Sequence, residues 1–429
     1  MWLVVPSLKI ISDPLLAGRI VSILISLLTL YGAYYLSKRY FQPKTALVAA
    51  LFFTFTPFLV FFDRMALTDS MLAAFSFWSL ILALETVEKP SAKNIILLGL
   101  ILGASILTKT PGMFNFFLLP LALIKADFKN KKKLTKSILG LTLSAIIGLC
   151  LYNSLRISPY FKQLGKRNEY YHFPISRLWE KPLDPFIGNT KEGFVFLTKL
   201  MTWPVFLTFI FAIFLSLYKK KKENIIIFLW GAIPFIILTA LLKTYTARYI
   251  LPSIVTFIFL ASWSFAEISE KIAKNRKAVF STLTTLVLIP AIIFDYQLIT
   301  KPWQANLPKK EKDGYFEGWT AGYGIKEMAN FLKEKAKDQK ILVVTAGAFG
   351  TLPDGLEIYI GKNKNIEVWY SSSQIESYVY EKLKEKPVYF VIHKSNLVQN
   401  PNLNLIKEIP KPPWKENPTD SLLLYQIIN

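Results

Sequence analysis

Cysteine and acidic residues are scarce in this chain of 429 residues. Cys150 is the single cysteine, which excludes an intrachain disulfide and a cysteine-based metal site. Lysine and arginine number 51 against 29 aspartate and glutamate residues, so the formal net charge is +22. Such an excess can indicate a nucleic-acid partner, but the lysine runs lie between apolar stretches rather than on one polar face. We therefore expect no nucleic-acid binding and interpret the charge as a signal of membrane orientation.

The apolar content is far above that of a soluble domain. Hydrophobic residues make up 52% of the chain and aromatic residues 15%, and the mean hydropathy is +0.36. Stretches of about 16 to 24 apolar residues recur, long enough to cross a hydrocarbon layer of ~30 Å as helices. We predict a polytopic α-helical membrane protein with about ten spans. The spans lie near residues 15–37, 45–62, 69–87, 94–108, 112–125, 135–154, 195–218, 224–242, 248–266 and 278–296.

Cationic loops orient these spans, because such loops stay on the cytoplasmic side. The loops that we predict to be cytoplasmic are 38–44, 88–93, 125–136, 219–223 and 267–277. The segments that then share the outer face are 63–68, 109–111, 155–194, 243–247 and everything after about residue 297. The N-terminus also falls outside in this scheme, so we expect a further span upstream of this sequence.

The pattern changes after the last predicted span. Residues 297–339 are predicted to form an outer-face linker and helix, after a transmembrane domain over 1–296. Strand-like runs then alternate with helical stretches such as 374–385, which predicts a small extracytoplasmic α/β domain over 340–429. Its expected strands are 341–344, 366–370, 388–392 and 422–428. The stretch 347–355 lacks the Gly-Lys-Ser/Thr ending of a phosphate-binding loop, so we interpret it as a plain loop.

Ionisable residues at the outer ends of the spans are the candidate functional residues, because charge within a membrane is costly and often functional. Asp63, Arg64 and Asp69 lie where one predicted helix ends and the next begins. They form either a solvated turn in which Asp69 caps the following helix or a functional cluster. Lys109 lies at the tip of a hairpin that a Pro-Gly pair breaks. It is either a snorkelling anchor or a contact for a lipid phosphate.

Two further outer segments carry candidate residues. Lys243 and Arg248 lie before the span near 248–266, and a cation held there over a pocket between helices would suit an isoprenoid phosphate. In the long outer segment, Glu169 and His172 have side chains that can ligate a divalent metal. Two residues at this spacing are weak evidence, so a metal stays a secondary alternative.

Several motifs carry a family resemblance when they are taken in order. They are Arg-Met-Ala-Leu-Thr-Asp over 64–69, Thr-Lys before a Pro-Gly turn at 108–112, and Arg-Tyr-Ile-Leu-Pro over 248–252. They resemble the Arg-x-Ala-Leu-x-Asp, Thr-Lys-Gly and Arg-Tyr-x-Leu-Pro segments of GT-C glycosyltransferases, of the dolichyl-phosphate-mannose protein mannosyltransferase type and the related lipid A aminoarabinose transferases. Arg19 fits the arginine that begins the second helix of that family. The resemblance covers roughly residues 1–295, and the outer domain is similar by architecture only.

The resemblance implies a plasma-membrane enzyme that moves a sugar, with inversion, from a polyprenyl-phosphate donor to an acceptor hydroxyl on a protein, lipid or glycan. A carboxylate acts as general base, and basic residues hold the donor phosphate. Asp69 matches a second acidic site residue, Lys109 a donor-phosphate contact and Arg248 a basic residue near the same cavity. We add Asp63 as a catalytic candidate, and Arg64 and Lys243 as phosphate-binding candidates.

The sequence departs from this family at one important place. The family's catalytic Asp-Glu pair has no counterpart before Arg19, and Asp13 is a poor match. We therefore expect that the sequence begins inside the family's first outer loop and lacks its base, for which Asp63 or Asp69 would have to substitute. Two other functions stay open: a transporter or flippase of a lipid-linked substrate, although no internal repeat supports it, and a non-catalytic membrane scaffold.

Overall fold

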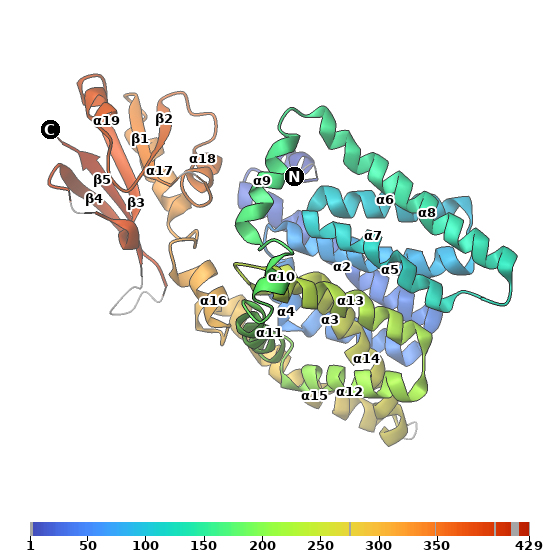
Figure 1. Cartoon of the computed structure of the whole chain (residues 1–429). Coiled ribbons are helices and arrows are strands. Elements are labelled where there is room, and N and C mark those ends of the chain that lie inside the picture. Colours follow the sequence, from blue (N-terminus) through green and yellow to red (C-terminus); the bar gives the residue numbers. More distant parts are fainter. Residues whose placement is uncertain (1–2, 274–275, 348, 399, 413–419, 429) are drawn as a thin grey trace. The chain divides into compact units, whose positions relative to one another are not determined.

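The computed structural model describes residues 3–273, 276–347, 349–398, 400–412 and 420–428, apart from the side chains of Leu164, Lys166 and Arg167. It divides into a helical unit up to Lys301 and an α/β unit from Pro302 (Figure 1). Residues 274–275 of the last predicted cytoplasmic loop lie outside the described residues.

The helical unit contains the apolar helices that the hydropathy pattern predicts. Among the described residues, six helices are long and apolar enough to cross a membrane, and two bent pairs raise the number to as many as eight. The chain is therefore an integral, multi-pass membrane protein. The apolar helices are α2 (Pro14–Tyr40), α3 (Pro43–Phe55), α4 (Pro57–Asp63), α5 (Thr68–Glu88), α6 (Ala92–Thr108), α7 (Phe114–Ala122), α8 (Lys131–Asn153), α11 (Phe186–Leu200), α12 (Trp203–Lys219), α13 (Lys222–Leu241), α14 (Leu251–Ala273) and α15 (Lys277–Thr300). The short helices are α1 (Val4–Ile10), α9 (Phe161–Tyr171) and α10 (Arg177–Glu180).

Two of the predicted spans are broken. The span predicted over 195–218 is not one straight helix, because α11 and α12 meet at an angle of 115°. Between them Thr202 has a φ of 65°, which residues other than glycine rarely adopt. The predicted span 45–62 is bent by 56° between α3 and α4. Its break lies at Thr56, which is extended because the residue before a proline disfavours the helical conformation.

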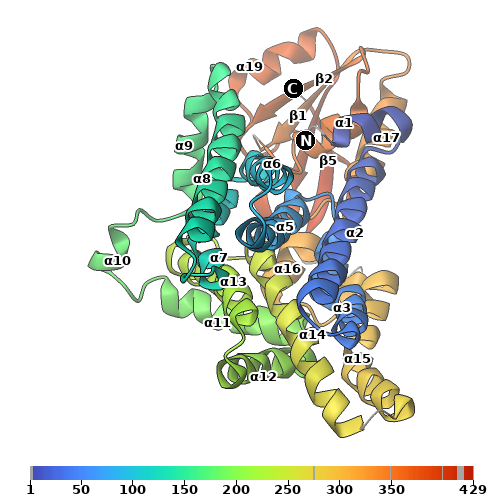
Figure 2. The ribbon, with the colours of Figure 1, turned by 90° about the vertical axis from the view of Figure 1, so that its right-hand side faces the viewer.

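Helices α5 and α14 form the centre of the helical unit. The apolar part of α5 is 78% buried and that of α14 is 89% buried, whereas the values for α2 and α15 are 28% and 22%. Figure 2 shows α5 lying between α2 on one side and α6 and α8 on the other, and α5 contacts all three helices. The residues that begin α5 and α14 are therefore held from several sides.

Ion pairs join the loops that the lysine pattern assigns to the cytoplasmic side. Lys125 Nζ lies 2.6 Å from Glu88 Oε1 and 2.8 Å from Glu223 Oε1. Lys44 Nζ lies 2.8 Å from Glu270 Oε1. These residues are far apart in the sequence, so the pairs place their loops on one common face of the helical unit, as the charge pattern predicts.

The α/β unit is built on a five-stranded sheet in the order β2-β1-β3-β5-β4. The first three strands are parallel, and β5 is antiparallel to both of its neighbours. Its strands and helices are β1 (Ile341–Ala346), β2 (Ile366–Ser371), β3 (Val388–His393), β4 (Leu403–Pro410), β5 (Ser421–Ile427), α16 (Lys309–Lys312), α17 (Ile325–Lys335), α18 (Asp354–Ile360) and α19 (Ser377–Glu381). Helices α17 and α18 pack on one face of the sheet, and α19 packs on the other. The structure confirms the predicted small α/β domain; β4 was not predicted.

A buried polar cluster lies at the carboxyl end of β3. Lys411 Nζ donates to Gly318 O at 2.7 Å and lies 3.1 Å from Asp420 Oδ2. His393 Nδ1 lies 3.6 Å from the same carboxylate oxygen, and the side chains of His393, Lys411 and Asp420 are all buried. The pKa of His393 is lowered from 6.5 to about 4, first by burial and then by the charge of Lys411, while Asp420 opposes the shift.

We expect the sheet to lose stability as the pH falls from 6.5 toward 4. The unfolded chain binds a proton at His393 in this range and the folded chain does not, so protonation favours unfolding. Hydrogen exchange of β3 amides in the full chain, corrected for the intrinsic pH dependence, is expected to be faster at pH 5 than at pH 7. The variant His393→Gln should remove this difference, and His172→Gln should retain it. Equal pH dependence in both variants would contradict the assignment.

Candidate functional site

Asp69 and Lys109 form an ion pair between the ends of two apolar helices. Asp69 is the second residue of α5, where the helix dipole favours a negative charge, and it is only 3% exposed. Lys109 follows the last residue of α6, and its Nζ lies 2.6 Å from Asp69 Oδ1. The solvated-turn interpretation is therefore wrong, because Asp69 is buried and paired.

A tight turn fixes the position of Lys109. Helix α6 ends at Thr108, and Lys109 itself is extended, so the predicted hairpin is present. A Cβ atom on Gly112 would lie 2.4 Å from the backbone of Ser105, which leaves no room for a side chain. Ser105 Oγ donates to Gly112 O at 3.3 Å. The Pro-Gly turn thus folds back directly onto α6 and holds Lys109 at its end.

Arg248 and Tyr249 complete the cluster from a third segment. They lie in a short 3₁₀ turn, Ala247–Ile250, that leads into α14. Lys109 Nζ lies 4.4 Å from the centre of the Tyr249 ring, and Arg248 Cζ lies 5.0 Å from it. Arg248 Nη2 also donates to Tyr249 Oη at 3.2 Å. Two cations therefore lie against this ring, and Asp69 pairs with one of them.

Lys243 lies in a different environment from Lys109 and Arg248. Its Nζ donates to Glu169 O at 2.6 Å, and its backbone N–H donates to Tyr171 O at 2.9 Å. These bonds attach the segment that carries α9 to the connection between α13 and α14. Lys243 thus has a structural role in joining two segments that the charge pattern places on the same face.

No metal-binding group is found in the part of the chain that the structure describes, where no three His, Cys, Asp or Glu side chains gather. The backbone of His172 pairs with Leu242 as an isolated bridge. Burial lowers the pKa of His172 below 6.5, and the charge of Lys243 lowers it further. Glu169 is exposed and uses its carbonyl to accept from Lys243.

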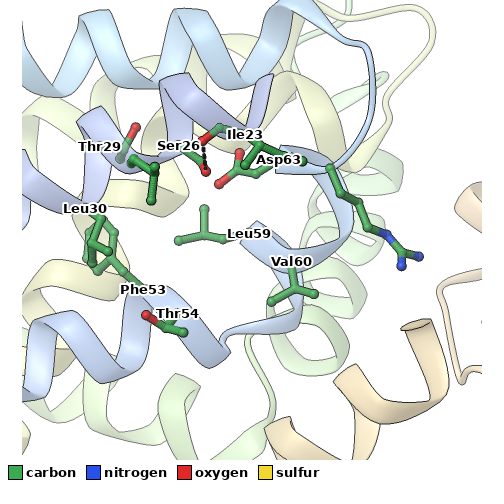
Figure 3. Close-up of a pocket in the computed structure, with 11 residues that line it drawn as sticks. Ile23, Ser26, Thr29, Leu30, Phe53, Thr54, Leu59, Val60 and Asp63 are labelled. Carbon is green, nitrogen blue, oxygen red and sulfur yellow. Dashed lines mark hydrogen bonds between the residues drawn. The ribbon is translucent and has the colours of Figure 1, made fainter. Parts of the chain in front are cut away.

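Asp63 and Arg64 line a cavity of about 240 Å³ between α2, α3 and α4. Figure 3 shows Leu59 and Asp63 of α4 facing Thr29 of α2 across this cavity. Its other lining residues are Ile23, Ser26, Leu27, Leu30, Phe53, Thr54 and Val60. Close by, Arg64 interacts electrostatically with Asp295 of α15, whose two carboxylate oxygens have no hydrogen-bond partner among the described residues.

Arg19 lies on α2 where this helix meets the turn between α4 and α5. A Cβ atom on the preceding Gly18 would lie 2.8 Å from Ala66 Cβ, and Ser22 Oγ donates to Leu67 O at 3.4 Å. Arg19 itself is exposed. The N-terminal half of α2 is therefore packed against the segment that carries Asp69.

Sequence reasoning missed two residues of this region. Tyr249 lies inside the Arg-Tyr-Ile-Leu-Pro motif, but nothing in the sequence indicates that its ring contacts Lys109. Asp295 did carry a signal, because it is the single acidic residue in the apolar run 278–296, and a lone carboxylate in a span is costly.

Comparisons with known proteins agree with the motifs. Residues 1–152 match the family model of dolichyl-phosphate-mannose-protein mannosyltransferases, a stretch that contains Asp69 and Lys109 but not Arg248. No curated protein matches the chain.

Two crystal structures of ArnT from Cupriavidus metallidurans are similar to the chain in fold. The apo structure is 12% identical with a TM-score of 0.58, and the structure bound to undecaprenyl phosphate is 14% identical with a TM-score of 0.57. Each comparison covers 99% of this chain and 86% of the ArnT chain. The resemblance to GT-C glycosyltransferases is confirmed, in sequence over residues 1–152 and in fold over nearly the whole chain.

We expect Asp69 and Lys109 to be energetically coupled. Removing either charge leaves its partner without compensation, so Asp69→Asn and Lys109→Gln should each destabilise the protein. The double variant should be destabilised by less than the sum of the two single effects. A double-mutant cycle from thermal unfolding in detergent should give a coupling free energy of about 1–3 kcal/mol. The exposed pair Lys382 and Glu385 is the control and should show no measurable coupling. A coupling of zero at the first pair would contradict the ion pair.

Proposed function

We propose that this protein is a membrane glycosyltransferase that takes a sugar from a polyprenyl-phosphate-linked donor and passes it to an acceptor hydroxyl. The observation that carries the proposal is the cluster in which Lys109 and Arg248 lie against Tyr249 beside the buried Asp69. The match to the mannosyltransferase family and the fold shared with ArnT support the reaction class. The ArnT structure with undecaprenyl phosphate supports the donor class.

The two cations have a role that follows from the charge of the reaction. A sugar bound to a lipid phosphate is a phosphodiester with one negative charge, and the departing lipid phosphate gains more charge as its bond to the sugar breaks. Lys109 and Arg248 stabilise this developing charge more strongly than the charge of the bound donor. Asp69 positions Lys109 through the ion pair.

The acceptor oxygen forms a bond to the anomeric carbon while the bond from that carbon to the phosphate oxygen breaks, which inverts the configuration. The acceptor proton passes to a carboxylate base. Of the two carboxylates, Asp69 is already engaged by the ammonium group of Lys109. Asp63 lines the neighbouring cavity and is the better candidate within this chain. Arg64 beside it is a further candidate for phosphate binding.

In this proposal the sugar is transferred on the outer face of the plasma membrane. The loops joined by Lys125 and Lys44 are rich in lysine and are assigned to the cytoplasm. The cluster of Asp69 and the C-terminal α/β unit then belong to the extracytoplasmic side.

We expect Lys109→Ala and Arg248→Ala each to reduce donor binding by about tenfold or more, because each removes a charge-assisted hydrogen bond to phosphate. The measurement is binding of a short-chain polyprenyl phosphate to the purified protein, followed by transfer of labelled sugar from the corresponding donor. Both variants should still insert and fold; Lys109→Ala is expected to be less stable because Asp69 loses its partner, so binding is measured well below its unfolding temperature. Lys131→Ala, on the opposite face, is the matched control.

Other outcomes separate the alternatives. Unchanged donor binding and phenotype in both variants would favour a scaffold and overturn the proposal. Flux of the lipid-linked substrate across vesicles without sugar transfer would favour a transporter. Asp63→Asn should abolish transfer while leaving polyprenyl phosphate binding intact, and transfer at the normal rate in this variant would exclude Asp63 as the base.

The orientation has its own test. In a Cys150→Ser background, Lys384→Cys in the α/β unit should react with a membrane-impermeant maleimide on intact cells, and Lys131→Cys should react only after the membrane is opened. Both lysines are exposed, so burial does not account for a difference. The reverse labelling pattern would contradict the outer location of the α/β unit.

A further inference from the structure

The two edges of the C-terminal sheet differ in how they are protected. An edge strand presents unpaired N–H and C=O groups that another strand can join, and proteins usually block it with a bulge, a lysine or a proline. Edge strand β4 has all three. Its register is irregular between Leu405 and Lys407, Lys407 Nζ lies 2.8 Å from Glu327 Oε1, and the strand ends at Pro410.

The opposite edge strand, β2, has none of these features. The strand Ile366–Ser371 contains no proline, lysine or arginine, and its pairing with β1 is regular over six residues. Within the described residues β2 pairs with β1 alone. This edge is therefore open to another strand.

The pairing register shows which backbone groups face outward. Ile341 N–H donates to Asn365 O at 2.8 Å, and Gly347 N–H donates to Ser371 O at 3.2 Å. In a parallel strand, the N–H and C=O of one residue point to the same side, and successive residues alternate. The odd-numbered residues of β2 therefore face β1, whereas Val368 and Tyr370 turn their N–H and C=O groups toward the open edge.

A cleft of about 560 Å³ lies along this edge. Val368 and Tyr370 line it, together with Trp369, Tyr378 and Glu376. The rings of Trp369 and Tyr378 pack with their centres 5.8 Å apart, and Tyr370 is 65% exposed. The cleft thus combines free strand hydrogen-bonding groups with aromatic walls and one carboxylate.

We infer that this cleft binds an extended polypeptide segment, which adds to the sheet as a sixth strand beside β2. The outward groups of Val368 and Tyr370 supply the backbone hydrogen bonds, and the aromatic walls receive apolar side chains at alternate positions. Glu376 favours a basic residue in the bound segment. A glycan would use the aromatic rings but would not require the hydrogen-bonding pattern of an open strand. This binding site does not depend on the proposed transfer reaction.

The test uses the full chain in detergent micelles and a nine-residue peptide of alternating valine and threonine with a central lysine. We expect the peptide to slow hydrogen exchange of the Val368 and Tyr370 amides by roughly tenfold or more, because these amides become part of a ladder. The same peptide, N-methylated at every backbone amide, should have no effect.

A matched pair of variants isolates the backbone contribution. Tyr370→Pro removes the outward N–H without removing a bond to β1, since proline is tolerated on an edge strand. Tyr370→Thr removes the ring and retains the N–H. Peptide protection at Val368 should be lost in Tyr370→Pro and retained in Tyr370→Thr, with exchange of β1 and β3 amides unchanged in both variants.

Four results would overturn the inference. Three concern peptides: protection that persists in Tyr370→Pro, protection by the N-methylated peptide, and no effect of the lysine peptide. The fourth is slow exchange of the β2 amides that depends on protein concentration in the absence of peptide. The last result would identify a second copy of this chain as the occupant. Protection of the cleft by a linear glucan oligosaccharide, with none by the peptide, would identify a glycan site.

Discussion

Hydrocarbon does not solvate charge, and this constraint determines where the ionisable side chains of the helical unit lie. At one end, Lys125, Glu88 and Glu223 meet from three different segments of the chain. At the other end, Asp69, Lys109 and Arg248 come from three more. The apolar helices between these ends carry few charges, so each end forms a compact polar layer in which partners are forced to meet.

The candidate site gains its geometry from the helices that begin or end at it. Asp69 is the second residue of α5 and Arg248 precedes α14. These are the two most buried helices among the candidate membrane spans of the described residues. Lys109 is held by a turn that has no space for a side chain at Gly112. Side chains placed on rigid, well-packed elements are positioned more accurately than side chains on free loops. The site therefore combines a fixed carboxylate with fixed cations, which suits recognition of a phosphate.

Much of this architecture could be predicted from the sequence, because apolar length and loop charge are local signals. The positions of the spans and the common face of the lysine loops follow from them. The break at Thr202 could not be predicted, since a positive φ at a threonine is imposed by packing. Strand β4 was missed because its exposed edge carries Lys407 and Glu408, which disrupt the expected apolar pattern. The contact of Tyr249 with Lys109 depends on how α6 and α14 pack and has no local signal; Asp295 had one that we did not use.

The bond from Lys411 to Gly318 has a consequence for how the protein is made. It connects the beginning of the α/β unit to its last two strands, and α17 shares a core with Ile409 and Leu422. About 100 residues separate Gly318 from Asp420, so these contacts are long-range and slow to form. A nascent chain that has delivered α17 still lacks the strands on which this helix packs. The unit therefore matures in one late step, after β5 has left the ribosome, while the membrane helices are already in place.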